Sequence, residues 1–414
     1  MKTRRAMLAS LIVLALLIGV STGASMERAG WIPGAIRYEP EGVAPTFSVF
    51  WETWDLVHNK FVDREAIQPK KMTYGAIQGM LDSLGDVEHT RFLSPDDLRK
   101  EQEALQGRLE GIGAQLVVRN GAPTVLAPVP GSPAQAAGIR PGDIIVRVDG
   151  RDVAGLTLEE IVNMVRGPRG TMVTVTVIHS GDTTLTDIAV TRARVTVPNV
   201  TWVKVPGTNT VHILISQFGE RATQELVVAL NSARSGGATS IILDLRNDPG
   251  GLRDEAVSVA SQFLKDGNVL IEQDSEGKRT QFPVESGGAA TDLPMVVLIN
   301  EGSASAAEIV AGALQDHQRA RLIGATTFGT GTVLGTYELS DGSAVLLGIA
   351  EWLTPNGRQI WHQGIRPEVE VALPTGAFPL IPEVENGLSP EQVQGSQDTQ
   401  LLRALQELGS GGPT

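Results

Sequence analysis

The sequence predicts an α/β core with a covered mixed sheet, preceded by a β-rich domain with helices and by an N-terminal helical segment. Between residues 211 and 350, aliphatic runs typical of buried strands alternate with amphipathic helical stretches, which is the pattern of a sheet covered by helices. Between residues 101 and 194, short β-rich runs are separated by Gly and Pro. Before residue 100, apolar residues recur at helical spacing.

The composition is that of a globular protein with two or three domains, since the chain has 414 residues of which 42% are hydrophobic. Its formal net charge of −13 argues against a nucleic-acid partner and against adhesion of its surface to anionic lipid. The absence of cysteine excludes disulfides, thiolate catalysis and cysteine-based zinc sites. The sequence contains no metal-ligand pattern and no phosphate-binding loop, so we expect neither a metal nor another cofactor.

Residues 1–26 have the pattern of an export signal. Basic residues near the N-terminus precede an uncharged, largely apolar run over residues 6–20, and small residues up to Ala24 suit a cleavage site. The run is short for a membrane span. We expect a signal peptide, with an uncleaved N-terminal anchor as the alternative, and a protein exported to the periplasm, the cell envelope or the extracellular space. Contact with a membrane is expected only through that anchor.

The N-terminal region consists of a tether and then helices. Residues 27–44 are rich in Gly and Pro and are expected to be the tether. The helical region follows over residues 45–100, with helices predicted at 47–61 and 74–84. His89 comes after these helices in a turn-like segment. We expect its side chain to pack or to hydrogen-bond, because no metal-ligand spacing surrounds it.

The remaining elements follow in order along the chain. The β-rich domain over residues 101–194 has strands near 117, 124–128, 143–148 and 172–178, and a helix after the N-cap residue Thr157. The core over residues 195–380 has strands at 211–215, 241–245, 296–299 and 345–350, with helices at 222–233, 254–264 and 306–315. Residues 381–414 are polar apart from a helical pattern at 401–408, so we expect a linker with a weak interaction helix.

Ser305 is the strongest candidate for a catalytic residue. It lies among small residues between the buried strand at 296–299 and the helix at 306–315. A serine at a strand-to-helix junction is exposed on a sharp turn, and the first free N–H groups of the helix can stabilise an oxyanion. By itself this position is more often a helix N-cap than a nucleophile, so the neighbouring motifs decide.

Those motifs have the order and spacing of a known family. One motif, at 300–309, contains Ser305. The others lie before and after it along the chain, at 242–251, 328–333, 353–360 and 363–368. Together they resemble the carboxyl-terminal processing peptidases, which are serine endopeptidases that combine a PDZ domain with a Ser-Lys protease core. The resemblance covers roughly residues 45–375 and implies a PDZ domain at 101–194 and a serine-peptidase core at 195–380. The fold class it implies is an α/β protease core with a covered mixed sheet, an inserted PDZ domain and an N-terminal helical segment.

The resemblance implies a role for each residue of the site. Ser305 matches the nucleophile, and the oxyanion donors are expected to be the amide of Ala306 and one amide from the turn that contains Gly250 and Gly251. If this match is set aside, the two glycines permit a helix-entry turn.

The residue that activates the nucleophile is missing from the motif. Thr330 occupies the position of the family's base lysine, and Leu334 occupies the position of the glutamine that orients that lysine. A threonine hydroxyl is too weak a base to accept the serine proton at neutral pH. Other groups considered as a base are Glu308, Asp316, His317 and His362. Helix spacing argues against Asp316 and His317, and Glu308 is expected to be a first-turn carboxylate favoured by the helix dipole.

The PDZ resemblance also implies a binding site. Such domains add a peptide C-terminus as a strand to a sheet edge, and backbone N–H groups of a Gly-rich loop hold its carboxylate. The expected loop consists of Gly111, Ile112, Gly113 and Ala114. The alternative is that these glycines permit a tight turn.

Two hypotheses follow for the function. The first is an exported serine endopeptidase that trims the C-terminal ends of proteins with Ser305, with hydrolysis impaired because the lysine is absent. The second is a catalytically dead pseudoprotease that binds or presents protein tails as an adaptor. The retained serine favours an enzyme, and the joint loss at positions 330 and 334 favours impaired or absent turnover.

Overall fold

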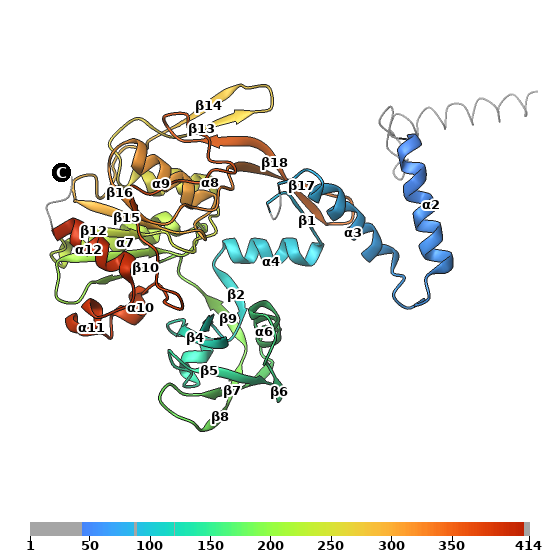
Figure 1. Ribbon diagram of the computed structural model, residues 1–414, viewed down its shortest axis with the longest axis horizontal. Coiled ribbons are helices and arrows are strands. Elements are labelled where there is room, and N and C mark those ends of the chain that lie inside the picture. The colour runs from blue at the N-terminus through green and yellow to red at the C-terminus, as the bar shows by residue number, and fades with distance from the viewer. Residues whose placement is uncertain (1–43, 87–88, 120, 410–414) are drawn as a thin grey trace, which may run out of the picture. The chain divides into compact units, whose positions relative to one another are not determined.

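The computed structural model describes residues 44–86, 89–119 and 121–409 (Figure 1). The predicted signal peptide or anchor at 1–26 and nearly all of the predicted tether lie outside these residues. The chain divides into two units, one that ends at Ala76 and one that begins at Ile77. Within the described ranges no helix is both long and apolar enough to cross a bilayer.

The first unit contains helix α2 (Ala44–Lys60) and the beginning of α3 (Pro69–Asp82). Aromatic side chains of α2 contact one another along the helix. The ring centroids of Phe50 and Trp51 are 5.1 Å apart, and those of Phe50 and Trp54 are 6.2 Å apart. Side chains four residues apart are neighbours on a helix, so the contact between Phe50 and Trp54 supports the helical conformation.

The core of the second unit is a six-stranded mixed sheet with the order β10-β11-β12-β15-β16-β19. β10 and β11 pair in the antiparallel direction, and all the other neighbours are parallel. The strands are β10 (Val200–Lys204), β11 (Thr210–Ile215), β12 (Ser240–Asp244), β15 (Met295–Ile299), β16 (Arg321–Gly324) and β19 (Val369–Glu370).

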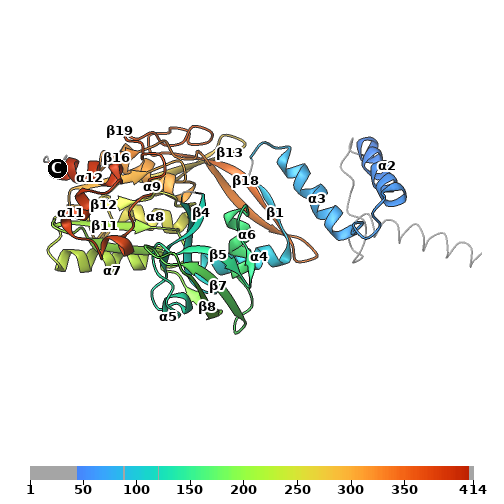
Figure 2. The same ribbon diagram turned by 60° about the horizontal axis from the view of Figure 1, so that its bottom comes forward.

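Helices cover both faces of this sheet, as Figures 1 and 2 show. Alternate residues of a strand point to opposite faces. Ile241 and Leu243 belong to the hydrophobic cluster formed with α7 (Ala222–Ser235), α8 (Arg253–Ser261) and α9 (Ala306–Asp316). Ile242 belongs to a second cluster, with residues of α12 (Thr399–Gly409). The predicted α/β core with a covered mixed sheet is therefore confirmed.

A second sheet of the same unit is antiparallel throughout. Its path is β1-β18-β13-β14, and β17 pairs with β18. The strands are β1 (Arg91–Leu93), β13 (Asn268–Asp274), β14 (Arg279–Pro283), β17 (Thr332–Glu338) and β18 (Ala344–Leu353). β1 and β17 both pair with β18. The sheet therefore brings the segment before β1 close to the segment before β17, which contains Thr330.

The β-rich domain is inserted between two short paired strands, β2 (Arg108–Gly111) and β9 (Ala193–Thr196), after helix α4 (Pro95–Leu105). Its sheet has the order β3-β4-β5-β7-β8, with β6 paired to β5. Its elements are β3 (Ala114–Arg119), β4 (Ala122–Pro128), α5 (Pro133–Ala136), β5 (Ile144–Val148), β6 (Arg151–Asp152), α6 (Leu158–Val165), β7 (Met172–Ile178) and β8 (Leu185–Thr191). The domain has a hydrophobic cluster of its own.

The C-terminal segment differs from the polar linker that the sequence predicts for residues 381–414. It forms α10 (Pro382–Glu385), α11 (Pro390–Gln394) and α12. Leu401 and Ala404 of α12 are fully buried against the core sheet. The segment is therefore an integral part of the core as far as residue 409.

Buried charges hold this segment in place. Arg246 follows β12 and donates hydrogen bonds of 2.9 and 3.0 Å to the Asp398 carboxylate. His212 lies between Glu385, at 2.6 Å, and Asp244, at 3.1 Å. Burial alone would lower the pKa of His212, but the two carboxylates raise it to about 9. These side chains are almost wholly inaccessible to solvent, so the network is stable only while every partner is in place.

Candidate active site

The backbone of Ser305 has a strained conformation. It lies between β15 and α9, with φ 52° and ψ −114°. A non-glycine residue in this region costs about 1–3 kcal/mol, and such strain persists only where the surroundings impose it. The amide of Ala304 donates a 2.9 Å hydrogen bond to the carbonyl of Asp248, which ties the turn to the end of β12. A strand, a strained serine and a helix in succession form the geometry that presents a nucleophile.

Two free amides lie beside this serine. A Cβ atom added to Gly250 would lie 2.7 Å from the Ser305 Cβ and 2.9 Å from the Ala306 nitrogen, so only glycine leaves this space open. The amide of Gly250 itself donates a 2.8 Å hydrogen bond to Asp248 Oδ1. The amides of Ala306 and Gly251 donate to no described residue. The structure thus brings Gly250 to Ser305 and Ala306, and of the two glycines only Gly251 has an amide without a partner among the described residues.

Asp248 is a residue of this site that sequence reasoning missed. Its side chain is fully buried, and its Oδ2 atom has no hydrogen-bond partner among the described residues. Burial raises its pKa well above the usual range, and the charge of Asp244 acts in the same direction. The sequence did contain a feature that could have identified it, namely an aspartate two residues before Gly250. An aspartate side chain commonly accepts a hydrogen bond from the backbone amide two residues further along the chain.

Glu308 holds the turn of Ser305 to the loop before β17. Its Oε2 accepts hydrogen bonds from the amides of Ser305, at 3.0 Å, and Thr330, at 2.9 Å. Its Oε1 accepts from the Thr327 hydroxyl, at 2.5 Å, and from the Gly329 amide, at 2.7 Å. Burial raises the pKa of Glu308, against the effect of these four donors. With both oxygens engaged, this carboxylate is a structural acceptor and has no free position from which to take the serine proton.

Thr330 and Leu334, at the positions where the family resemblance predicts a base and its partner, lie just before and within β17. The shared contact with Glu308 places the amide nitrogens of Ser305 and Thr330 at most about 6 Å apart. Thr330 is buried two residues before the start of β17, whereas Leu334 is a partly buried residue within that strand. Neither side chain can accept a proton at neutral pH.

Asp316 and His317 lie at the far end of α9 and are engaged there. Asp316 accepts a 3.0 Å hydrogen bond from the Arg358 guanidinium. The Nε2 atom of His317 is 2.8 Å from the carbonyl oxygen of Asn268. The helix thus separates both groups from Ser305 by its full length, as its spacing predicts.

His362 lies on an exposed loop next to the segment before Thr330. Its amide donates a 2.9 Å hydrogen bond to the Gly329 carbonyl, and its ring stacks on that of Trp361. The side chain is exposed to solvent, and no hydrogen bond to a described residue holds its ring in place.

The side chain of His89 forms a hydrogen bond, as we expected for a histidine in a turn. Its partner is Thr332, two residues after Thr330. The Nδ1 atom of His89 hydrogen-bonds to the hydroxyl of Thr332, the first residue of β17. The carboxylate of Asp86 lies 3.8 Å from the same nitrogen. An imidazole and a carboxylate therefore lie at Thr332, which is two residues along the chain from Thr330.

The predicted peptide-binding loop borders a groove in the β-rich domain. A cavity of about 200 Å³ is lined by the loop and by residues of α6, among them Val162 and Val165. β3 is the last strand of its sheet, so its outer edge is unpaired within the described chain. Gly113 has φ 75°, and a Cβ there would lie 2.5 Å from the Ser132 Cβ. An apolar groove beside an open strand edge has the features that strand addition requires.

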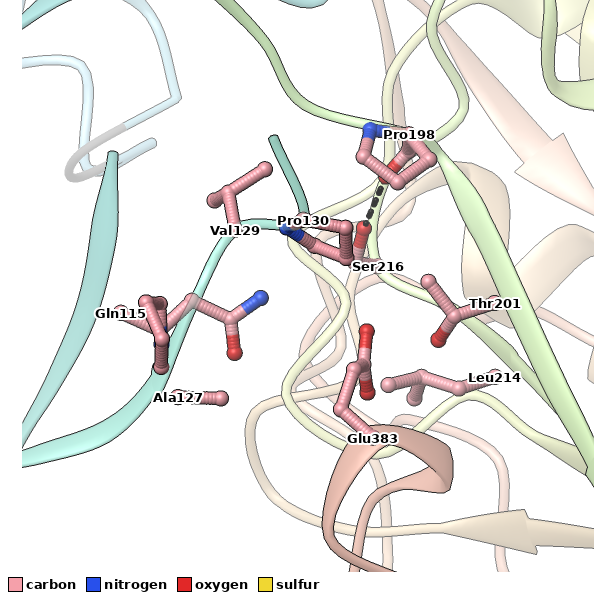
Figure 3. Close-up of a pocket in the computed structure, with 10 residues that line it drawn as sticks. Gln115, Ala127, Val129, Pro130, Pro198, Thr201, Leu214, Ser216 and Glu383 are labelled. Carbon is pink, nitrogen blue, oxygen red and sulfur yellow. Dashed lines mark hydrogen bonds between the residues drawn. The ribbon is translucent and has the colours of Figure 1, made fainter. Parts of the chain in front are cut away.

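A second, smaller pocket lies between loops of the β-rich domain and residues of the core (Figure 3). Gln115 approaches it from one side, and Thr201 and Glu383 from the other. It contains none of the residues predicted for catalysis or peptide binding.

Comparison with known proteins agrees with this architecture. The model of peptidase family S41 matches residues 209–371, and a PDZ domain model matches residues 124–178. A carboxyl-terminal-processing protease of Synechocystis sp. is 36% identical over 356 residues, which cover 85% of this chain and 81% of that protein. The carboxy-terminal processing protease CtpA of Bacillus subtilis is 37% identical over 305 residues, which cover 73% of this chain and 65% of that protein.

A solved structure also has the same fold. The structure of an S41 protease from Bacteroides fragilis has a TM-score of 0.56 at 16% identity, and it covers 91% of this chain and 99% of its own. At this identity the likeness concerns the fold alone. No group of three metal-ligating side chains is found in the part of the chain that the structure describes.

Proposed function

The chain belongs to the carboxyl-terminal processing peptidases of family S41, and on this premise we propose that it is a slow serine endopeptidase acting on protein C-terminal tails. Its PDZ domain binds the tail and Ser305 attacks the peptide bond. Turnover is impaired because Thr330 and Leu334 replace the lysine and glutamine that the family resemblance leads us to expect. The N-terminal pattern over residues 1–26 supports export from the cytoplasm.

The observation that carries this proposal is the strained backbone of Ser305 beside the free amides of Ala306 and Gly251. Strain of this kind clusters at active sites, where the surrounding structure imposes it. An amide that stabilises a developing oxyanion is worth about 10²–10³ in rate. A purely adaptor protein needs neither feature.

The direct test compares the full chain, purified in mild detergent, with its Ser305→Ala variant on an unfolded protein substrate. We expect slow cleavage that disappears in the variant, and labelling of the wild type alone by a fluorophosphonate probe. Equal background in both proteins would contradict the endopeptidase. The alternative, a pseudoprotease that presents tails, is favoured by Thr330 and Leu334, and it predicts tail binding without cleavage or labelling.

Tail binding has a separate test. A peptide with an apolar last residue and a free carboxylate should bind the groove beside Gly111, Ile112, Gly113 and Ala114. Its amidated form should bind at least about tenfold more weakly, because backbone N–H groups hold the carboxylate. Equal affinity for both peptides would count against this mode of binding.

A further inference from the structure

The imidazole of His89 hydrogen-bonds to Thr332 and has no role in the Ser-Lys scheme that the family resemblance implies. Thr332 lies two residues beyond Thr330, so their Cα atoms are at most about 7 Å apart. The side chain of His89 reaches Thr332 from the segment before β1 and hydrogen-bonds to its hydroxyl. The amide of Thr330 in turn shares one Glu308 oxygen with the amide of Ser305. His89 is therefore bonded to the strand that follows Thr330, and Glu308 joins the loop before that strand to the turn of Ser305.

The carboxylate of Asp86 determines which nitrogen of His89 carries the proton. Asp86 Oδ2 lies 3.8 Å from Nδ1 and accepts a hydrogen bond of 3.5 Å from the Thr332 hydroxyl. It also accepts one of 2.7 Å from Thr90. With the threonine hydroxyl donating to Asp86, its oxygen accepts the proton of Nδ1. The Nε2 atom is then unprotonated, and no described residue hydrogen-bonds to it.

The ring is also kept neutral. Burial lowers the pKa of His89 to about 4, and the positive charge of Arg91 acts in the same direction, whereas Asp86 opposes both. At neutral pH the imidazole is consequently unprotonated on one ring nitrogen. A neutral imidazole that is oriented through its far nitrogen by a hydrogen-bonding partner, with a carboxylate nearby, is similar to the arrangement that activates a serine in other hydrolases.

We propose that His89, oriented by Thr332 and Asp86, is the general base for Ser305 in place of the missing lysine. This inference rests on the proposed endopeptidase function. Because His89 is held through Thr332 rather than by the serine itself, one water molecule relays the proton.

The reaction balances without any further reactant. The Ser305 proton passes through the water to Nε2 of His89 while Oγ bonds to the carbonyl carbon, and the oxyanion is held by the amides of Ala306 and Gly251. Protonated His89 then returns the proton to the leaving nitrogen as the C–N bond breaks, which leaves an acyl-serine. A water molecule, deprotonated by the same imidazole, hydrolyses the ester and restores Ser305. Asp86 acts as a positioning residue and keeps its charge.

The test measures Ser305-dependent cleavage by the full chain in wild type, His89→Gln and His362→Gln. Glutamine retains a donor for Thr332, so the first variant is expected to fold, which thermal unfolding checks. We expect a loss of at least about 100-fold in kcat/KM for His89→Gln and less than about twofold for His362→Gln, the matched control on the exposed loop. In His89→Ala, added imidazole should restore part of the rate.

The outcomes separate this inference from the proposed function. Cleavage by the wild type that depends on Ser305 but survives in folded His89→Gln would overturn the role of His89 and leave the endopeptidase standing. No Ser305-dependent cleavage in the wild type would overturn both. A loss in His89→Gln that imidazole does not rescue in His89→Ala, together with an unchanged pH profile of the residual rate, would assign His89 a purely structural role and overturn the inference.

Discussion

The amide of Thr330 donates a 2.9 Å hydrogen bond to the carboxylate of Glu308. This contact joins the loop before β17 to the first turn of α9, and so it limits the distance between Ser305 and Thr330, where the family resemblance predicts a lysine. The same carboxylate accepts from three other donors and is fully buried. A residue that sequence reasoning assigned to the helix dipole is therefore the central acceptor of the site.

Replacing Glu308 by glutamine should destabilise the protein by about 2–4 kcal/mol, since an amide NH₂ cannot accept the hydrogen bonds that one carboxylate oxygen accepts. Urea unfolding measures the loss. Glu301→Gln is the matched control, because Glu301 is exposed just ahead of the same helix and should change stability by less than about 0.5 kcal/mol. Equal effects of the two variants would contradict the role of Glu308.

Restoring the expected pair should raise the rate. The double variant Thr330→Lys and Leu334→Gln supplies a basic amine and a partner to orient it, which is expected to increase Ser305-dependent cleavage by about 100-fold or more. Adding His89→Gln to this variant should then have little effect, because the lysine makes the imidazole redundant. An inert double variant with a native thermal unfolding transition would show that the cleft differs from a Ser-Lys site in more than these two residues.

Gly250→Ala should abolish turnover. The new Cβ would lie 2.9 Å from the Ala306 nitrogen and would enter the space of the oxyanion, which is expected to cost at least about 100-fold in rate. Gly277→Ala is the control, because Gly277 has a similar φ of 80° but no atom within 4 Å of an added Cβ. In Gly277→Ala the alanine would have an unfavourable positive φ but no steric clash, so the variant should be less stable and should keep the cleavage rate of the wild type. A Gly250→Ala protein that retains turnover would exclude this turn from the oxyanion site.

Local patterns in the sequence predicted the elements that determine the fold. The strands at 241–245 and 296–299 were recognisable because every residue except Asp244 is aliphatic, as is typical of strands covered on both faces. Ser305 was recognisable for a related reason, since a buried strand, small residues and an amphipathic helix follow one another directly. These signals depend on residues that are neighbours along the chain.

The features that the sequence did not predict depend on distant partners. The C-terminal segment was expected to be a polar linker because Glu385, Asp398 and Gln400 are typical of exposed chain. In the structure their partners are Arg246 and His212, more than 150 residues away. The acceptor role of Glu308 likewise requires a loop that starts 19 residues later. Polarity alone does not distinguish a solvated charge from a buried pair.

Asp398→Ala should unfold the C-terminal segment or destabilise the whole core by about 3–5 kcal/mol, because it leaves the buried guanidinium of Arg246 with one carboxylate fewer. It also removes the acceptor of the Leu401 amide at the start of α12. Chemical unfolding and limited proteolysis of the segment measure the effect. Arg403→Ala breaks an exposed pair with Glu407 and should cost less than about 1 kcal/mol. Similar losses in both variants would contradict the buried network.

His89 should make the stability of the protein depend on pH below neutrality. Its pKa is lowered to about 4 in the folded state, chiefly by burial, from an ordinary value of 6.5. The unfolded chain therefore binds more protons than the folded one between pH 6.5 and 4, and stability falls as the pH decreases through this window. The loss amounts to about 3 kcal/mol at most. His89→Gln should remove that part of the fall, whereas His362→Gln should not. Unfolding free energies measured in urea at pH 7, 5.5 and 4 test this difference, and parallel curves for wild type and His89→Gln would show that His89 is not buried as a neutral ring.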